Sequence, residues 1–567
     1  MKNQEIADIF NKIADALEFK SEDTFRINAY RRAARVISEL ATSIESIHAK
    51  GELREIPGIG EGIAKKIDEY LKTGKMQKLT EVTHDLSDGL LNLLSVQGVG
   101  PKTLSLAYKK LGVRSLDDLK QVIDDGRLAK LPMMGERKVA NIDRGVALFS
   151  KFKGRMLLGR ALPLVDEIIE LLKTKPGIKQ ISPAGSLRRM QETVGDIDIL
   201  VTGEHPQKII DYFIHLPQVK NVLAAGETKA SIILDGERQV DLRVVEESSY
   251  GAALQYFTGS KAHNIRLRGM AKERGLKINE YGVFKDDRRL AGETEKDVYQ
   301  TLKLPWIPPE LREDRGEIEA ALNGQLPDLV NYDALRGDLH IHSHYSDGAS
   351  SIEAIALEAK RLDYEYICIT DHSRVARYAG GLSVAKLAQQ VEEIKQVNRH
   401  LKGITVLAGT EMDILADGEV DFPNEVLKKL DFVIGSIHSG FKQNVTARIL
   451  KAMENPYVNV IAHPTGRLIS TREGYKDLDL EAVFKKAAQT KTALEINAFP
   501  DRLDLNDINV KRAKELGICF TIGTDTHRVD MMKYAHMGLA VARRGWLTQA
   551  DILNTYPLVQ LKRMLRS

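Results

Sequence analysis

The last third of the chain alternates short apolar runs with residues that can bind metals. The runs YICIT, ITVLAG, FVIGSI, VNVIA and CFTIG each lead into histidine, aspartate or glutamate. Amphipathic helical patterns lie between these runs. Ligands at the carboxyl ends of successive strands, with helices between the strands, are typical of a β/α barrel whose site lies at its mouth. The sequence therefore predicts such a barrel from about residue 336 onward.

Histidines are concentrated in this part of the chain, where nine of the 14 fall between Gly337 and Ser567. A single histidine after a strand is more often structural than a ligand, but six at successive strand ends indicate a metal centre. Imidazole mixed with carboxylate suits Mn²⁺, Zn²⁺ or Fe²⁺ better than Mg²⁺. The candidate ligands are His340, His342, Asp347, His372, Glu411, His438, His463, Asp525 and His527.

This set resembles the PHP domain, named for polymerase and histidinol phosphatase, over about Arg336 to Ser567. The resemblance implies a distorted (β/α)₇ barrel that holds up to three Mn²⁺, Zn²⁺ or Fe²⁺ ions and hydrolyses phosphate esters. It leaves His344, Asp371 and Asp413 outside the ligand set. It assigns one ion to His340, His342, Glu411 and Asp525, a second to Glu411, His438 and His463, and a third to Asp347, His372 and His527.

A second centre is indicated by AGSLRRMQETVGDIDILV, from Ala184 to Val201. Asp196 and Asp198 stand one residue apart at the start of a β-rich run, so strand alternation places both carboxylates on one face. Carboxylates that close repel each other unless a cation lies between them, and oxygen ligands suit Mg²⁺ or Mn²⁺. Asp241, in RQVDLRVV, supplies a third carboxylate on the second arm of a hairpin expected to turn at Asp235-Gly236.

Upstream of these carboxylates the sequence predicts an anion site. Gly185-Ser186 begins a segment that can form a short helix carrying Arg188 and Arg189. Backbone N–H groups, a hydroxyl and a guanidinium at a helix start bind anions. The anion that also binds divalent metal is a nucleoside triphosphate, so the two parts of this stretch fit one substrate.

These residues resemble the palm of family X DNA polymerases, within the nucleotidyltransferase superfamily. The segments YFTGS (256–260) and INEYGVF (278–284) extend the likeness, which runs from the N-terminus to about Trp306. It implies template-directed addition of deoxynucleotides by a two-metal mechanism, with Asp196, Asp198 and Asp241 as catalytic ligands of Mg²⁺ or Mn²⁺ and Asp241 also as general base. It assigns nucleotide binding to Gly185, Ser186, Arg189, Gly195, Tyr256, Phe257, Gly259 and Asn264, and DNA binding to Arg268.

The N-terminal part contains three turns with a shared plan, in which an apolar residue and a glycine-containing turn precede a helix. IPGIGEGIAKKI (56–67) and VQGVGPKTL (96–104) resemble the helix-hairpin-helix motif, which implies backbone contacts of Gly58, Gly60, Gly98 and Gly100 with DNA phosphates. The third copy, LPMMGERKVANI (131–142), has only Gly135, and its turn is either structural or a further DNA contact.

In the same family a lysine of the first domain can form a Schiff base as a lyase. Lys66 stands at the matching position of AKKIDEY, although the turn before it has Gly62 where a second basic residue is expected. A solvated surface lysine is the alternative interpretation.

The chain as a whole is a multidomain α+β and α/β protein, because 567 residues exceed a single core of about 250 to 300 residues. Cys368 and Cys519 lie in apolar runs and are expected to be reduced, and no apolar run is long enough to cross a membrane. We expect a cytoplasmic monomer that binds gapped or nicked DNA and dNTPs and no membrane. The predicted domains are 1–80 (helix-hairpin-helix, lyase-like), 81–150 (second helix-hairpin-helix), 151–250 (palm), 251–316 (thumb-like), 317–335 (linker) and 336–567 (PHP).

The two centres together predict a repair polymerase that fills short gaps and carries a 3′–5′ exonuclease, with cleavage at abasic sites and processing of 3′ ends as further reactions of the barrel. The alternatives are a nucleotidyltransferase for a non-DNA acceptor fused to a phosphatase, and a non-catalytic scaffold on broken DNA ends. Basic residues near the C-terminus are either DNA contacts or a solvated helical face: Arg528, Arg543, Arg544, Lys562, Arg563 and Arg566.

Overall fold

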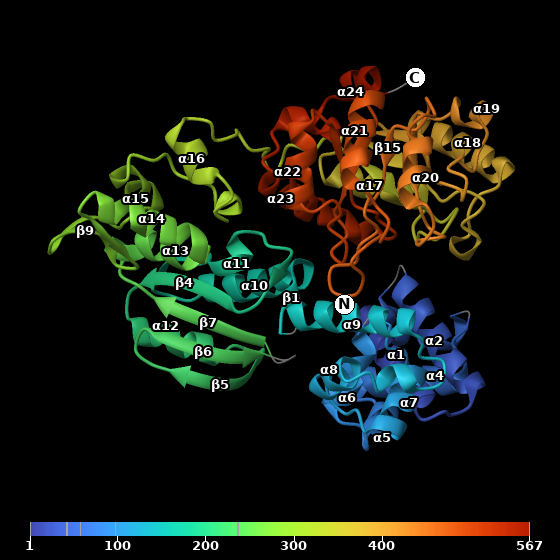
Figure 1. The fold of residues 1–567 in the computed structure, drawn as a ribbon, viewed down its shortest axis with the longest axis horizontal. Coiled ribbons are helices and arrows are strands. Elements are labelled where there is room, and N and C mark those ends of the chain that lie inside the picture. The colour runs from blue at the N-terminus through green and yellow to red at the C-terminus, as the bar shows by residue number, and fades with distance from the viewer. Residues whose placement is uncertain are drawn as a thin grey trace. The chain divides into compact units, whose positions relative to one another are not determined.

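The computed structural model of the chain describes residues 2–40, 43–56, 58–96, 98–152, 154–234 and 238–565. The predicted turn at Asp235-Gly236 and the side chain of Arg566 lie outside these residues. The chain forms two compact units, shown in Figure 1: Met1–Lys153 with the short segments Asp347–Ser351 and Leu468–Gly474, and the remainder from Gly154 to Ser567. No helix within the described residues is both long and apolar enough to span a membrane.

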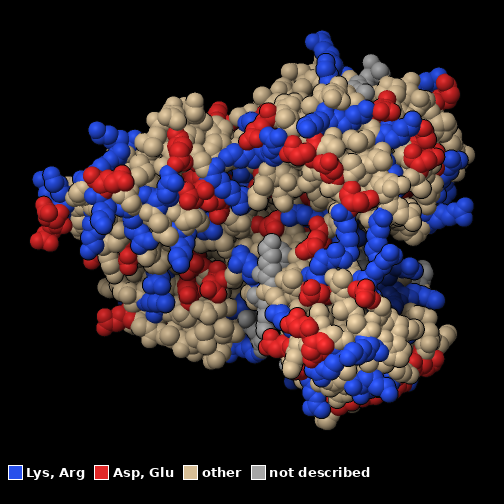
Figure 2. All heavy atoms as spheres, in the orientation of Figure 1, with Lys and Arg blue, Asp and Glu red and all other residues tan. Residues whose placement is uncertain are grey.

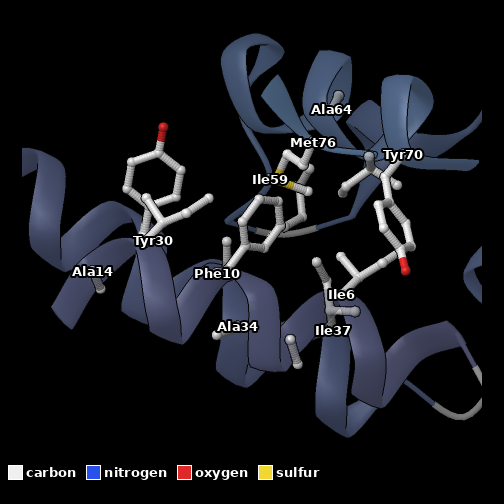
Figure 3. Packing of buried hydrophobic residues seen from close by; sticks show 14 of the residues in the cluster. Ile6, Phe10, Ala14, Tyr30, Ala34, Ile37, Ile59, Ala64, Tyr70 and Met76 are labelled. Atoms are coloured by element: carbon white, nitrogen blue, oxygen red, sulfur yellow. The ribbon is translucent and has the colours of Figure 1, made fainter. Parts of the chain in front are cut away.

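The first unit is helical and is built around the packing of α1 on α2. Phe10 and Tyr30 place their ring centroids 5.8 Å apart, and Figure 3 shows Phe10 lying beside Ile59 of the first hairpin. Burial of this apolar face is the main force that holds the short helices together. The helices are α1 (Lys2–Phe19), α2 (Thr24–Glu39), α3 (Ile44–Ala49), α4 (Glu61–Thr73), α5 (Gln77–Thr83), α6 (Asp88–Asn92), α7 (Pro101–Leu111), α8 (Leu116–Asp124) and α9 (Glu136–Phe152).

The three predicted hairpin turns share one backbone conformation. Each follows a 3₁₀ turn, has a residue with positive φ, then a buried apolar residue, then a glycine that caps the next helix. The third turn has the same form as the first two, but Met133 occupies the positive-φ position with its side chain 83% exposed. The corresponding sets are Gly58, Ile59 and Gly60; Gly98, Val99 and Gly100; and Met133, Met134 and Gly135.

The palm is a mixed sheet whose strands run in the order β2-β4-β7-β6-β5 in the described residues. Strands β4 and β7 are parallel neighbours, and Asp198 is in register with Asp241. Asp196 lies just before β4 rather than within it. The elements are β1 (Met156–Leu157), α10 (Leu158–Lys173), β2 (Ile178–Pro183), α11 (Gly185–Arg188), β3 (Thr193–Val194), β4 (Ile197–Gly203), α12 (Pro206–Ile214), β5 (Val219–Ala225), β6 (Lys229–Leu234) and β7 (Arg238–Val244).

The thumb-like part packs helices on a small antiparallel sheet, β10-β9-β8. Arg312 is fully buried there and donates to Glu295 Oε1 at 2.6 Å, so its charge is neutralised where water cannot reach it. The elements are α13 (Tyr250–Thr258), α14 (Lys261–Glu273), β8 (Lys277–Asn279), β9 (Gly282–Lys285), β10 (Arg288–Ala291), α15 (Glu295–Thr301) and α16 (Glu317–Leu322).

The C-terminal part is a barrel of seven parallel strands in chain order, β11 to β17, within residues 238–565 of the described chain. A parallel bridge between Ile341 and Thr526 brings the first and last strands together. The predicted distorted (β/α)₇ barrel is therefore confirmed. Its strands are β11 (Gly337–Ile341), β12 (Tyr366–Ile369), β13 (Thr405–Asp413), β14 (Phe432–Ser436), β15 (Val460–Ile461), β16 (Ala493–Asn497) and β17 (Phe520–Gly523).

Helices surround these strands, as the 3.6-residue periodicity predicts. They are α17 (Ile352–Arg361), α18 (Val384–His400), α19 (Asn424–Leu427), α20 (Val445–Ala452), α21 (Leu480–Thr490), α22 (Asp507–Glu515), α23 (Ala535–Arg544) and α24 (Leu558–Met564).

The barrel and the polymerase-like half pack together within the second unit. A Cβ on Gly159, near the start of α10, would lie 2.5 Å from Cβ of Pro500 in a barrel loop. Arg543 and Arg544 fit neither interpretation made from the sequence, since both are largely buried in this interface and pair with Glu310 and Asp507. The predicted domain boundaries stay predictions.

Replacing Gly159 by alanine tests this close approach. The added methyl group must displace Pro500, and overpacking of this kind costs about 1–3 kcal/mol. We expect Gly159→Ala to lower the melting temperature measured by calorimetry. Gly269→Ala in α14 is the control, because a Cβ there meets nothing within 4 Å and should leave stability unchanged or slightly raised. Equal stability of the two variants would contradict the packing of α10 on the barrel.

Candidate active sites

The palm places three carboxylates where the start of β4 lies beside the middle of β7. Asp198 and Asp241 are half-buried and face each other on neighbouring strands, and Asp196 is exposed just ahead of them. Burial and the negative charge of Asp241 raise the pKa of Asp198 to about 6. Mutual repulsion of this kind is relieved when a cation lies between the carboxylates, so the donor set fits Mg²⁺ or Mn²⁺.

The segment before β4 is held against these carboxylates. The backbone N–H of Ala184 donates to the carbonyl of Asp198 at 2.8 Å, and Gly185 has φ +62°. A Cβ at Gly185 would lie 2.8 Å from Asp198 Oδ2, so only glycine permits the approach. Ser186 follows as the second residue of α11.

The two arginines of this segment have different partners. Arg188 forms a bidentate pair with Glu295, at 2.7 and 2.8 Å, and so joins palm to thumb. Arg189 donates from Nε to Glu313 Oε1 at 2.7 Å and from Nη1 to the carbonyl of Thr258. Its Nη1 would lie 3.2 Å from a Cβ on Gly259, which places the predicted YFTGS segment beside the predicted anion site.

The other predicted nucleotide and DNA residues lie along α13 and α14. The Tyr256 and Phe257 rings are 5.2 Å apart, and Asn264 donates to the Tyr256 carbonyl at 2.7 Å. Arg268 lies one turn further on and donates to the Asn264 carbonyl at 3.3 Å. Gly195 lies elsewhere, in the turn before Asp196, where a Cβ would be 3.3 Å from Arg155 Nη1.

A cavity of about 570 Å³ separates β7 from the thumb-like sheet. Arg243 lies in its wall with its guanidinium 4.5 Å from the Phe257 ring centroid. Because Arg243 is two residues after Asp241 on β7, both side chains point to the same face. The sequence offered no specific signal for Arg243. The lining residues are Thr228, Lys229, Arg243, Val244, Val245, Glu246, Ser249, Phe257, Glu280, Tyr281, Phe284 and Arg289.

The barrel brings the candidate ligands together at the carboxyl ends of its strands. Three groups have potential ligand atoms within 4.8 Å of one another. Glu411 Oε1 also lies 3.0 Å from His463 Nε2, which adds the remaining predicted ligand to the cluster. The three groups are His340, His342 and Asp525; His372, Glu411 and His438; and His342, Asp347, His372 and His527.

Electrostatics in this cluster differ from those of the palm. Although burial opposes ionisation, the imidazoles of His438, His372 and His340 hold the pKa of Glu411 well below its usual range. Within the described residues, the buried atoms His340 Nε2, Glu411 Oε2 and His463 Nδ1 have no hydrogen-bond partner. Polar atoms are rarely buried in this way without a ligand, so the donor set fits metal ions.

Two backbone conformations at this site have positive φ, namely +30° at His463 and +54° at Asp525. Non-glycine residues adopt such angles at some energetic cost, and they cluster at functional sites. No local pattern predicts these two backbone angles.

Sequence reasoning missed Glu495, which supports the cluster from the middle of β16. Its Oε1 lies 2.6 Å from His340 Nδ1, and its Oε2 accepts from the backbone N–H of His463 at 2.8 Å. Asp413, expected outside the ligand set, lies 3.2 Å from His438 Nδ1 and is buried. His344 is exposed, and Asp371 is buried and accepts from Ser343.

Lys66, the lyase candidate, lies in α4 of the first unit. Its Nζ is 6.0 Å from the Tyr30 ring centroid and donates to the Gly62 carbonyl at 3.0 Å. Burial and the positive charge of Lys78 lower the pKa of the Lys66 amine.

A carboxylate trio beside a Gly-Ser anion loop defines a nucleotidyltransferase palm, and a histidine–carboxylate cluster at a barrel mouth defines a metal-dependent phosphoesterase. Family models match four parts of the chain. They match the "Helix-hairpin-helix domain" over residues 1–76, the "SAM-like Helix-hairpin-helix tandem" over 90–142, the "DNA polymerase beta thumb" over 253–313 and the "PHP domain" over 338–499.

Of three similar proteins, one covers the whole chain and two cover parts of it. DNA polymerase/3′-5′ exonuclease PolX of Bacillus subtilis (strain 168) is 37% identical over 576 residues, which cover 100% of both chains. DNA polymerase lambda of Arabidopsis thaliana is 28% identical over 55% of this chain and 62% of its own length. A probable phosphatase of Thermoanaerobacter sp. (strain X514) is 30% identical over 38% of this chain and 89% of its own length. The chain belongs to the family X DNA polymerases that carry a C-terminal PHP domain, as the sequence predicted.

Glu495 offers a test of the metal centre that does not depend on turnover. Glu495→Gln should weaken metal binding roughly 10- to 100-fold, because the charged acceptor that orients His340 is lost. Titration of the metal-stripped protein with Mn²⁺ or Zn²⁺ by calorimetry measures this. Glu481→Gln removes an exposed carboxylate from the same domain and should change nothing. Equal affinities of the two variants would exclude the supporting role.

Proposed function

We propose that this chain fills short gaps in DNA as a DNA polymerase and that its barrel acts as a 3′–5′ exonuclease. The observation that carries the proposal is the presence, in one chain, of two complete and separate sets of metal-binding side chains. The full-length similarity to a protein named DNA polymerase/3′-5′ exonuclease PolX supports it.

In the palm, Asp196, Asp198 and Asp241 would hold Mg²⁺ or Mn²⁺, which lower the pKa of the primer 3′-hydroxyl and neutralise the leaving pyrophosphate. Asp241 would accept the proton of that hydroxyl. Ser186 and Arg189 would bind the triphosphate, aided by backbone N–H groups that begin at Gly185.

The thumb side of the nucleotide site would contact the incoming sugar and base. Tyr256, Phe257, Gly259 and Asn264 lie together at the junction of α13 and α14, and Arg268 lies one turn further on, where it would contact the template strand. Gly195 would permit close approach ahead of Asp196. These roles follow from the family pattern and from the proximity of Gly259 to Arg189.

In the barrel, the nine ligands would hold up to three Mn²⁺, Zn²⁺ or Fe²⁺ ions, which turn water into a nucleophile and neutralise the phosphodiester. Glu495 would orient His340 through Nδ1, and Asp413 would do the same for His438. We further propose that abasic sites and 3′-end lesions are processed by the same centre.

DNA would be held by local contacts rather than by a general positive field. The net charge is only +3, and on the face seen in Figure 2 basic and acidic side chains are interspersed. Glycines at positions 58, 60, 98 and 100 leave backbone N–H groups accessible to phosphates, which suits sequence-independent binding of a gapped or nicked duplex. A monomer in the cytoplasm stays a prediction.

Two substitutions separate the proposed activities. Asp198→Ala should lower gap filling more than about 100-fold while sparing 3′–5′ exonuclease activity, because only the palm loses a direct ligand. His342→Ala should have the reverse effect. Both activities are measured on one labelled primer–template in Mg²⁺ or Mn²⁺. A single substitution that abolishes both would count against separate sites.

A second candidate activity is removal of a 5′ abasic remnant by Lys66. The observation that favours it is the lowered pKa of Lys66, caused by burial and by Lys78, since a neutral amine is the nucleophile in Schiff-base formation.

Borohydride trapping on an incised abasic site tests this activity. Trapping should increase as pH rises through the lowered pKa of Lys66 and should vanish in Lys66→Ala. Lys78→Gln removes a neighbouring positive charge, so it should raise the pKa of Lys66 and move the profile to higher pH. Lys72→Gln is the control, since Lys72 pairs with Asp68. An adduct that persists in Lys66→Ala would rule Lys66 out.

A further inference from the structure

The segment that precedes the palm carboxylates is held by side chains of the PHP barrel. Arg544 of α23 donates from Nη1 to the carbonyl of Arg189 at 3.0 Å. Arg467, four residues after the barrel ligand His463, donates to Glu192 Oε2 at 2.7 Å. We call residues 189–192 the nucleotide-site loop. This loop has two attachments to the barrel domain, one at Arg189 and one at Glu192.

Glu313 links Arg544 to the side chain of Arg189. Its Oε1 accepts from Arg189 Nε at 2.7 Å and from Gln191 Nε2, and it lies 3.4 Å from Arg544 Nη1. Arg544 is only 6% exposed. Ionic hydrogen bonds in such a setting are strong and directional, and removal of one partner leaves an uncompensated charge.

Arg544 is itself fixed from the barrel side. Its Nη2 donates to Asp507 Oδ2, which also accepts from Arg315 Nη1 at 2.7 Å. The planar guanidinium thus faces the nucleotide-site loop with one nitrogen and the barrel with the other. Lysine cannot reproduce this arrangement, because an ammonium is a single point of charge.

We propose that Arg544 of the PHP domain is a positioning residue for nucleotide binding by the palm. Through Glu313 and the Arg189 carbonyl it fixes the guanidinium of Arg189 where that group meets the triphosphate. The inference rests on the proposed role of Arg189 in holding the triphosphate. It makes the barrel a structural part of the polymerase site, in addition to its own chemistry.

The test is single-nucleotide gap filling by the full chain, with KM for dNTP and kcat measured separately. Arg544→Met should raise KM roughly 10- to 100-fold with a much smaller change in kcat, because Arg189 contacts the triphosphate in both ground and transition states. Arg544→Lys keeps the positive charge but not the planar guanidinium, so its KM for dNTP should lie between those of Arg544→Met and the unaltered chain. Exonuclease activity on a 3′ end should stay unchanged, since Arg544 contacts no ligand of the barrel cluster.

Arg543→Met is the matched control. Arg543 is the neighbour of Arg544 on α23 and donates to Glu310 Oε1 at 2.7 Å in the same interface, but its partners lie outside the nucleotide-site loop. The KM of Arg543→Met for dNTP should match that of the unaltered chain. Glu313→Gln is the second test variant, since it keeps the shape of the side chain and removes its charge. It should also raise KM, by a smaller factor than Arg544→Met.

A double variant separates this inference from the role of Arg189. If Arg189→Met raises KM and adding Arg544→Met raises it no further, Arg544 acts through Arg189. If Arg189→Met raises KM while Arg544→Met and Glu313→Gln do not, the positioning role is wrong and the role of Arg189 stands. If Arg189→Met leaves KM unchanged, the proposed role of Arg189 falls and the inference with it. An equal rise of KM in Arg543→Met and Arg544→Met would show a general loss of packing, and it would overturn the inference.

Discussion

Both centres depend on parallel pairing between strands that are separated in the sequence. In the palm, β4 and β7 are adjacent and in register, so Asp198 and Asp241 face each other although β5 and β6 intervene along the chain. A slip of one residue would turn one carboxylate to the opposite face of the sheet. In the barrel, seven parallel strands end at one rim, so the proposed ligands from six strands converge there.

The same geometry produces opposite electrostatics at the two centres. In the palm, burial and the negative charge of Asp241 raise the pKa of Asp198, although Arg243 and Lys229 act in the opposite direction. Imidazoles surround the barrel carboxylates, and His340 and His342 help hold the pKa of Asp525 well below its usual range, against the effect of burial. The barrel donors therefore partly compensate one another's charge, whereas the palm carboxylates need an external cation. This difference agrees with oxygen-preferring Mg²⁺ at one centre and nitrogen-binding metals at the other.

Local patterns predicted most of the architecture and the sites. Histidine and carboxylate after apolar runs located the barrel and all nine proposed ligands, and the glycine turns located two hairpins. Glu495 was missed because it lies inside strand β16, where a single carboxylate in an apolar run resembles an ordinary strand residue. The role of the third turn, structural or a DNA contact, stays open, because Met133 occupies the position that glycine fills in the other two.

The partners of Arg543 and Arg544 had no local signal. In the sequence, exposed and buried basic residues near the C-terminus cannot be distinguished. Arg544 contacts Glu313 and Arg189, which are 231 and 355 positions away along the chain. Such contacts depend on how two folded domains pack, which periodicity and spacing do not encode.

The contact between Gly159 and Pro500 limits how this architecture can be recombined. A barrel taken from another protein would collide with α10 if its loop at the position of Pro500 were bulkier. A hybrid enzyme would therefore need the surface of α10 and the barrel loop of Pro500 to be taken from the same protein. We expect the two halves to be inherited together rather than exchanged separately.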